Sequence, residues 1–70
     1  MIKVGQIWQQ QNSEVFVISA SKDWSYSKIY KDGYAITEDY LEENTDFVFN
    51  KMLAEYPTWQ EAVNSKEFNG

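Results

Sequence analysis

The chain of 70 residues contains no histidine, no cysteine and no arginine. Histidine is the usual acid or base near neutral pH, and cysteine the usual thiolate nucleophile or soft metal ligand. Arginine is the side chain that binds phosphate through two parallel hydrogen bonds. Because all three are missing, and because no serine has a histidine to activate it, we expect a protein that is not an enzyme. We likewise expect no catalytic residues, no cofactor and no metal ion.

Positive charge is also scarce and unevenly placed. Six lysines face eleven carboxylates, so the net charge is −5. Residues 1–31 hold four lysines and two acids (net +2), whereas residues 32–70 hold two lysines and nine acids (net −7). Nucleic-acid binding requires a clustered basic face, and this balance argues against it. A protein with a basic surface is the partner that the charge favours.

Long apolar runs are absent as well. The longest is the four-residue segment 15–18, far too short to cross a membrane, and no basic leader precedes an apolar stretch. The lack of cysteine fits a reducing compartment, so we expect a cytoplasmic protein that does not associate with membranes. With 43% hydrophobic and 17% aromatic residues, the chain can build one small core, and we expect a single domain over residues 1–70.

The residue pattern predicts mostly strands. Residues 2–9 form a first strand, with Gly5 at a bulge or a close approach of the backbone. Residues 15–18 are apolar without a polar face, which is typical of a central strand covered on both sides. Residues 26–36 form a hairpin, in which Asp32 and Gly33 supply the positive-φ pair of a tight turn.

Helix signals occur later in the chain. Thr37 followed by two acids predicts a short helix to residue 43, residues 46–49 a short strand, and residues 51–56 fit a strand or a helix. Thr58 and Glu61 form a capping box at the start of a helix over residues 58–67, with Phe68 packing back at its end. The expected fold is mainly β (α+β): a small, SH3-like, partly open barrel of four to five strands (about residues 2–56) with a C-terminal α-helix.

Two stretches resemble known proteins. Residues 3–8 (Lys-Val-Gly-Gln-Ile-Trp), followed by the apolar run 15–18, resemble the opening of many small SH3-like barrel proteins. Residues 54–68 are similar to the tails of short proteins from phages and prophages of Gram-positive bacteria. The resemblance covers less than half of the chain and supplies no catalytic residues. It implies a phage-encoded accessory protein, in some cases an inhibitor of host machinery.

The first candidate site is an acidic run. On a helix, Glu38, Glu42 and Asp46 would share one face, with Asp39 and Glu43 beside it. Such a surface can compete with nucleic acid for a basic groove and can accelerate encounter with a basic partner. The alternative is a solvated face that only keeps the protein soluble.

The second candidate site is aromatic. Trp24 lies in a turn, and Tyr26 and Tyr30 lie on the face of their strand opposite to Ile29, so these three aromatic residues are candidates for a contact patch. They could equally be core or edge-covering side chains, or form a homodimer interface.

Together these features predict a small acidic phage protein that binds a host protein with a basic surface and inhibits or redirects it. An anti-CRISPR protein and a nucleic-acid mimic are two forms of this prediction. One alternative is a structural module that assembles a phage complex by self-association. A weaker alternative is a single-stranded nucleic-acid binder that uses the lysines and tyrosines of residues 26–31.

Overall fold

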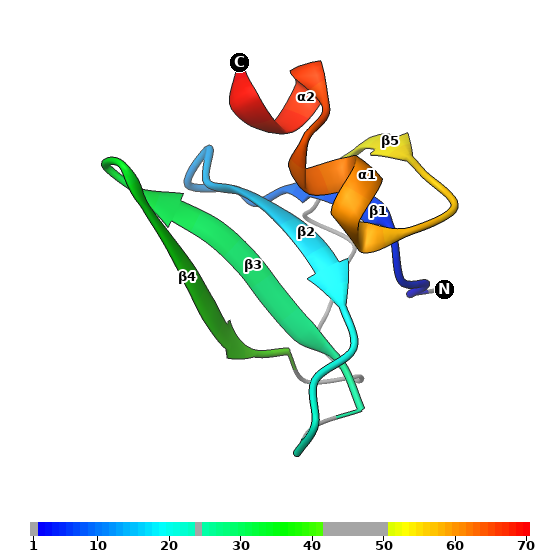
Figure 1. Cartoon of the computed structure of the whole chain (residues 1–70). Helices are drawn as coiled ribbons and strands as arrows, with labels where there is room; N and C mark the ends of the chain where they lie inside the picture. Colours follow the sequence, from blue (N-terminus) through cyan, green and yellow to red (C-terminus); the bar gives the residue numbers. More distant parts are fainter. Residues whose placement is uncertain (1, 24, 42–50) are drawn as a thin grey trace.

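The computed structural model describes residues 2–23, 25–41 and 51–70, and its structure is mainly β (Figure 1). In these residues, five antiparallel strands form one open sheet in the order β4-β3-β2-β1-β5. The elements are, in chain order, β1 (Gln6–Gln9), β2 (Val15–Ser19), β3 (Ser27–Asp32), β4 (Ala35–Tyr40), β5 (Lys51–Glu55), α1 (Trp59–Val63) and α2 (Lys66–Asn69). The predicted mainly-β class is thus confirmed. In the described residues no helix has the length and apolar character needed to cross a membrane.

The apolar strand β2 lies in the middle of the sheet, between β1 and β3. Because successive side chains of a strand point to opposite faces, Phe16 and Ile18 reach one face and Val17 reaches the other. All three side chains are buried. The strand is therefore covered on both faces, as its lack of a polar face predicts.

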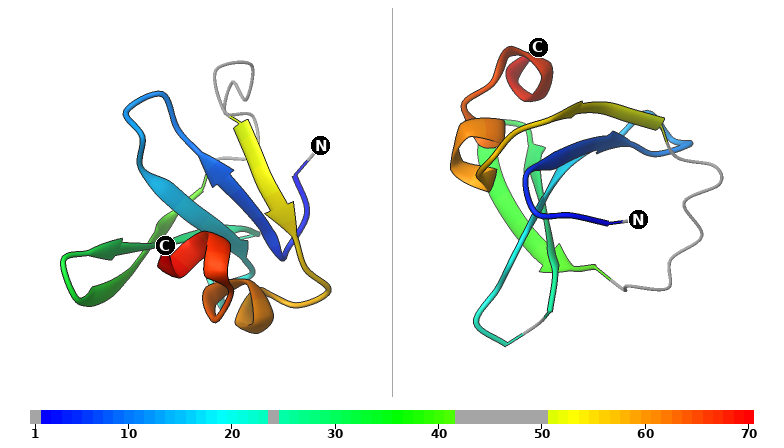
Figure 2. Two further views of the ribbon diagram at one scale, coloured as in Figure 1. Left: turned by 90° about the horizontal axis from the view of Figure 1, so that it is seen from above. Right: turned by 90° about the vertical axis from the view of Figure 1, so that its right-hand side faces the viewer.

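The sheet is bent (Figure 2), and two apolar clusters cover its two faces. The outer cluster lies under the helices, and its buried members are Ile7, Val17, Ile29, Ala62 and Phe68. The inner cluster lies on the side of the N-terminal segment, and its buried members are Phe16, Ile18 and Leu41, with Ile2, Trp8, Tyr26 and Tyr30 packed against them. The small protein thus divides its apolar side chains between the faces instead of leaving one face polar.

Gly5 is the close-approach point that the sequence predicts. Its φ is +98°, a conformation that L side chains rarely adopt. Its N–H donates to the Ile18 carbonyl (2.8 Å), and its carbonyl accepts from the Tyr56 N–H (2.9 Å). A Cβ here would meet the Tyr56 carbonyl oxygen well inside 3.0 Å. Glycine therefore lets the end of β5 lie directly against the start of β1.

The β3–β4 hairpin is present, but its turn lies one residue later than predicted. Asp32 pairs with Ala35, so the two turn residues are Gly33 and Tyr34. Only Gly33 has a positive φ (+67°), which is the sign pattern of a type II′ turn. The prediction of Asp32 and Gly33 as a positive-φ pair was therefore wrong, because the register places Asp32 in the strand.

The helix predicted from Thr37 to residue 43 was also wrong for its described part. β4 continues to Tyr40, and its six residues pair with β3 without a break in register. A helix this short is marginal by itself, whereas the hairpin offers cross-strand hydrogen bonds and places Asp39 opposite Lys28. The strand predicted over residues 46–49 lies outside the described residues.

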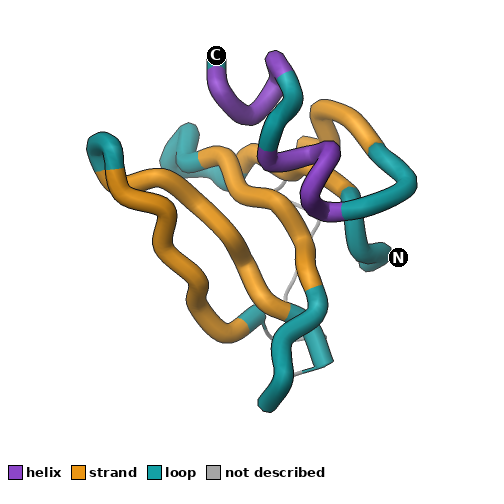
Figure 3. The backbone as a smooth tube through the Cα atoms, in the orientation of Figure 1, coloured by secondary structure: helices purple, strands orange, loops and turns teal. Residues whose placement is uncertain are grey.

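The C-terminal part begins with a strand. The segment 51–56, which the sequence left open, contains β5, whose pairing with β1 shifts register between Ile7 and Trp8. Such a shift marks a β-bulge, which bends and twists the edge of a sheet. Figure 3 shows the two helices following this strand.

The helix predicted over residues 58–67 is two short helices, α1 and α2. Thr58 caps α1 as predicted, since its Oγ1 accepts from the Glu61 N–H (3.2 Å). The break follows from Ser65, whose Oγ donates to the Ala62 carbonyl (2.5 Å) and accepts from the Phe68 N–H (3.3 Å). Phe68 is buried in the outer cluster, which confirms its expected packing.

Candidate protein-binding surface

Exposed apolar side chains gather on β4 and its turn. Among the described residues, the exposed large apolar side chains are Tyr34 (106%), Ile36 (53%), Tyr40 (53%) and Met52 (45%). The first three lie on β4 and its turn, and Met52 lies on β5 at the opposite edge of the sheet. We call Tyr34, Ile36, Glu38 and Tyr40 the β4 surface.

The β4 surface occupies one face of the sheet because of strand alternation. Ile36, Glu38 and Tyr40 are two residues apart, so their side chains point to the same face. It is the face that carries Ile29, which pairs with Glu38 and is buried in the outer cluster. The two helices pack mainly on β1 and β2, so this face of β4 extends beyond their cover (Figure 1).

The main chain of β4 also has an outward-facing edge. The Leu41 N–H donates to the Tyr26 carbonyl (3.3 Å), which makes that pair hydrogen-bonded across the hairpin. Hydrogen-bonded and non-bonded pairs alternate in an antiparallel ladder, so Thr37 and Asp39 face β3. Ile36 and Glu38 therefore direct their N–H and C=O groups away from the sheet. Within the described part of the chain, β4 pairs with β3 alone.

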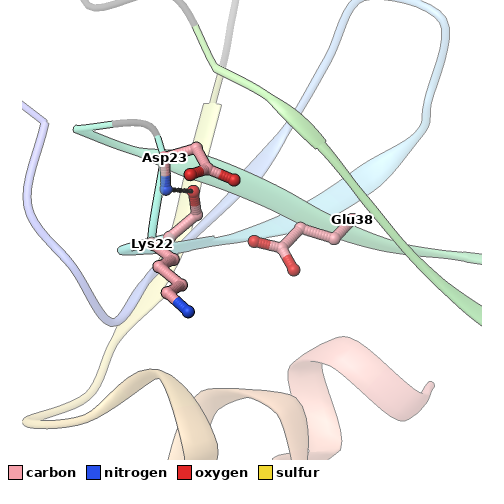
Figure 4. A pocket seen from close by; sticks show the side chains of 4 residues that line it. Lys22, Asp23 and Glu38 are labelled. Atoms are coloured by element: carbon pink, nitrogen blue, oxygen red, sulfur yellow. Dashed lines mark hydrogen bonds between the residues drawn. The ribbon is translucent and has the colours of Figure 1, made fainter.

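A shallow hollow of about 200 Å³ adjoins the β4 surface, lined by Ser21, Lys22, Asp23 and Glu38. Figure 4 shows the Glu38 side chain pointing toward the loop that carries Lys22 and Asp23. The Ser21 Oγ accepts from the Asp23 N–H (3.2 Å) and fixes the bend of that loop. In the described residues, the Glu38 carboxylate makes no ion pair or hydrogen bond, so it is available to an external cation.

The acidic run does not form the helical face expected for it. Glu38 and Asp39 are exposed residues of β4, and because they are consecutive in a strand their side chains point to opposite faces. The Asp39 Oδ1 accepts from the Tyr40 N–H (2.8 Å). Glu42, Glu43 and Asp46 lie outside the described residues, and their role stays a prediction.

The aromatic candidates are placed differently from the β4 surface. Tyr26 and Tyr30 are half-buried against the inner cluster, on the face opposite to Ile29 as expected. The Lys28 ammonium lies 5.0 Å from the centre of the Tyr30 ring. These contacts give both tyrosines a packing role, and a contact role for them stays a prediction. Trp24 lies outside the described residues.

The two lysines of β3, Lys28 and Lys31, both contact other residues of the protein, and their side chains point to opposite faces of the sheet. Lys28 forms an ion pair with Glu14 (3.6 Å). The Lys31 ammonium donates to Asn69 Oδ1 (2.6 Å) and lies 5.7 Å from the centre of the Phe68 ring. β3 therefore does not present a continuous basic face to which nucleic acid could bind.

Tyr34, Ile36 and Tyr40 were not predicted as site residues from the sequence. The signal was available, because Ile36, Glu38 and Tyr40 continue the alternation of the hairpin. It was missed because Thr37 resembles a helix cap, which predicts the end of the hairpin strand before Glu38 and Tyr40. Ile36 does share the face of Ile29, yet it is exposed because the helices end short of it.

One ionisable contact joins β5 to α2. The Tyr56 hydroxyl donates to the Glu67 carboxylate, and this hydrogen bond, followed by partial burial and the charge of Glu67, raises the pKa of Tyr56 above its ordinary value of 10.0. Tyr56 also lines a second hollow of about 280 Å³ with Lys3, Val4, Glu55 and Pro57. The contact fastens α2 to the segment that follows β5.

The described residues contain no cluster of side chains that could bind a metal ion. No three acidic side chains of residues 2–23, 25–41 and 51–70 come together as a group that could hold a metal ion. Comparisons of the chain with models of known protein families, with curated proteins and with solved structures found no match.

Proposed function

We propose that this protein is a small phage-encoded module, located in the host cytoplasm, that binds a host protein and inhibits or redirects it without catalysis or a cofactor. The observation that carries this proposal is the β4 surface, where Tyr34, Ile36 and Tyr40 expose apolar side chains along one edge strand and its turn. Exposed apolar patches rimmed by polar residues mark protein–protein interaction sites, and tyrosine is enriched among residues that dominate binding energy.

The charge supports a basic partner. The protein carries a net charge of −5, and the β4 surface includes Glu38. Long-range attraction would accelerate encounter with a basic surface, while the apolar side chains would supply most of the affinity. Anti-defence proteins, including anti-CRISPR proteins, are one class that would act by such occlusion. A ladder of carboxylates that imitates nucleic acid receives less support, because Glu38 and Asp39 point to opposite faces.

For the fold we propose a partly open barrel of the SH3-like type. The support is the strand order, in which β1 to β4 follow one another as neighbours and β5 returns to lie beside β1. The sheet is also bent, as in a partly open barrel (Figure 2), and the inner cluster lies on one of its faces.

Self-association is the second candidate function, and the outward edge of β4 favours it, since exposed edge strands pair readily with other chains. Two copies would bring together two chains of net charge −5 and two Glu38 side chains. Because of this repulsion, we place self-association second to binding of a basic host protein.

The test is an affinity pull-down of the tagged protein from lysate of a Gram-positive host, with and without nuclease. Two variants accompany the wild type: Ile36→Ser removes an apolar side chain of the β4 surface, and Met52→Ser is its matched control at the opposite edge. We expect one stoichiometric, nuclease-resistant partner that Ile36→Ser loses and Met52→Ser keeps.

Other outcomes would contradict the proposal. A partner that both variants retain equally would show that the β4 surface does not bind it. Recovery of the protein alone would favour self-association. Partners that disappear on nuclease treatment would favour nucleic-acid binding.

A further inference from the structure

The outer edge of β4 differs from the other edge of the sheet. β4 has six residues in unbroken register with β3, and contains no proline, lysine or bulge. β5 has five residues, begins with Lys51, and is interrupted by the register shift opposite Ile7 and Trp8. Short length, lysine and bulges are the devices by which proteins protect edge strands from pairing. β5 has the lysine and the bulge, whereas β4 has neither and carries the carboxylates of Glu38 and Asp39, so β4 is the edge better suited to pairing with a chain of opposite charge.

We propose that β4 takes up an extended segment of the partner protein as an added strand, and that this segment has the pattern apolar-x-basic-x-apolar. The inference rests on the proposed function and states its mode. The Ile36 and Glu38 main-chain groups, which face away from β3, would form the new ladder of hydrogen bonds. The Tyr40 N–H already bonds Asp39 Oδ1, so the ladder uses residues 36–38.

The side-chain pattern follows from the pairing. A residue of the added strand that pairs with Glu38 points to the same face as Glu38, and residues two positions away point to the same face beside Ile36 and Tyr40. Apolar side chains at these outer positions would cover Ile36 and Tyr40, which are each 53% exposed. A basic side chain at the central position would meet the Glu38 carboxylate.

The hollow beside Glu38 supports a basic central residue. The carboxylates of Asp23 and Glu38 both line it, and a lysine ammonium would fit a space of about 200 Å³. Lys22 also lines the hollow and is exposed, so its ammonium can extend into solvent while the two carboxylates receive the incoming cation (Figure 4).

Charge also decides between a foreign segment and a second copy. Pairing of β4 with β4 of another copy would place acidic residues, Glu38 and Asp39, on both strands, within an assembly of doubled negative charge. Like charges on paired strands are destabilising. A basic and apolar segment of another protein therefore fits this edge better than a second copy does.

The experiment titrates the isotopically labelled full chain with the peptide Thr-Val-Thr-Lys-Thr-Val-Thr, followed by NMR. The peptide has the same side-chain pattern in both directions, and we expect it to pair antiparallel to β4, as the neighbouring strands of this sheet do. We expect the amide signals of Ile36 and Glu38 to shift and to become protected from hydrogen exchange. Glu38→Lys should weaken binding about tenfold, because it turns a cross-strand attraction into a repulsion. Glu55→Lys makes the same change in net charge on β5 and should leave binding unchanged.

Two modified peptides test the ladder itself. N-methylation of the lysine nitrogen removes a donor that faces β4 and should abolish binding. N-methylation of the two threonines beside the lysine alters nitrogens that face away from β4, and binding should persist.

Four results would overturn the inference. The first is absence of peptide binding at β4, and the second is equal binding after N-methylation of the lysine. The third is an equal effect of Glu38→Lys and Glu55→Lys on binding. The fourth is a shift of the β4 amide signals with protein concentration alone, which would identify a second copy as the occupant. The pull-down with Ile36→Ser is independent of this peptide. A partner lost by that variant, together with a failed titration, would retain the binding function and reject only strand addition.

Discussion

Gly5→Ala should be among the most destabilising substitutions in this protein. The new side chain would have to adopt φ +98°, and a left-handed backbone costs an L residue about 1–2 kcal/mol. The Cβ would also lie well inside 3.0 Å of the Tyr56 carbonyl oxygen, which is backbone and cannot rotate away. The strand end must then move, which breaks the 2.9 Å hydrogen bond from the Tyr56 N–H to the Gly5 carbonyl at about 1 kcal/mol, in addition to lost packing.

The backbone conformation and the hydrogen bond together account for about 2–3 kcal/mol, to which the lost packing adds, against a total stability of about 4–10 kcal/mol for a domain of this size. The assay is denaturant unfolding followed by tryptophan fluorescence. Gly33→Ala is the matched control, because its φ is also positive (+67°) but a Cβ there meets nothing within 4 Å. The control should lose about 1–2 kcal/mol from conformation alone. Equal losses in the two variants would refute the role assigned to the contact between Gly5 and Tyr56.

Three further predictions concern the C-terminal helices. Thr58→Ala should lower the free energy of unfolding by about 1 kcal/mol, because the Glu61 N–H loses its cap; thermal unfolding measures this, and an unchanged midpoint would contradict it. Phe68→Ala should cost about 3–5 kcal/mol through the cavity left in the outer cluster, measured by denaturant unfolding; a loss below 1 kcal/mol would mean that α2 does not close the core. Since the folded state raises the pKa of Tyr56, the stability from its bond to Glu67 should be fully present below pH 10.0 and be lost as pH rises through the raised pKa. Wild type and Tyr56→Phe should therefore converge in stability above that pH, and a constant difference would count against the bond.

Local patterns predicted much of the fold because their physical cause is local. The β-branched and aromatic residues of segment 15–18 favour a strand covered on both faces, and the Thr58 cap needs nothing beyond its own first turn. Gly5 could be expected at a close approach for the same kind of reason, although the sequence could not say that Tyr56 would be its neighbour.

Two errors arose where a second interaction outweighed the signal that the sequence analysis followed. Thr37 resembles a helix cap, but pairing with Tyr30 in the hairpin makes it part of a strand. Ser65 divides the predicted helix because its side chain bonds the end of one helix and the start of the next. At Thr37 the pairing with another strand selected the conformation, whereas at Ser65 the two hydrogen bonds are themselves local.

The sequence by itself determined the charge, the lack of histidine, cysteine and arginine, and the alternation of apolar and polar residues along the strands. Only the tertiary structure decided which of those apolar residues are covered. Ile29 and Ile36 lie on the same face of one hairpin, yet Ile29 is buried and Ile36 is exposed. The physical reason is that alternation fixes the face to which a side chain points, whereas burial depends on how far the packed helices extend across that face.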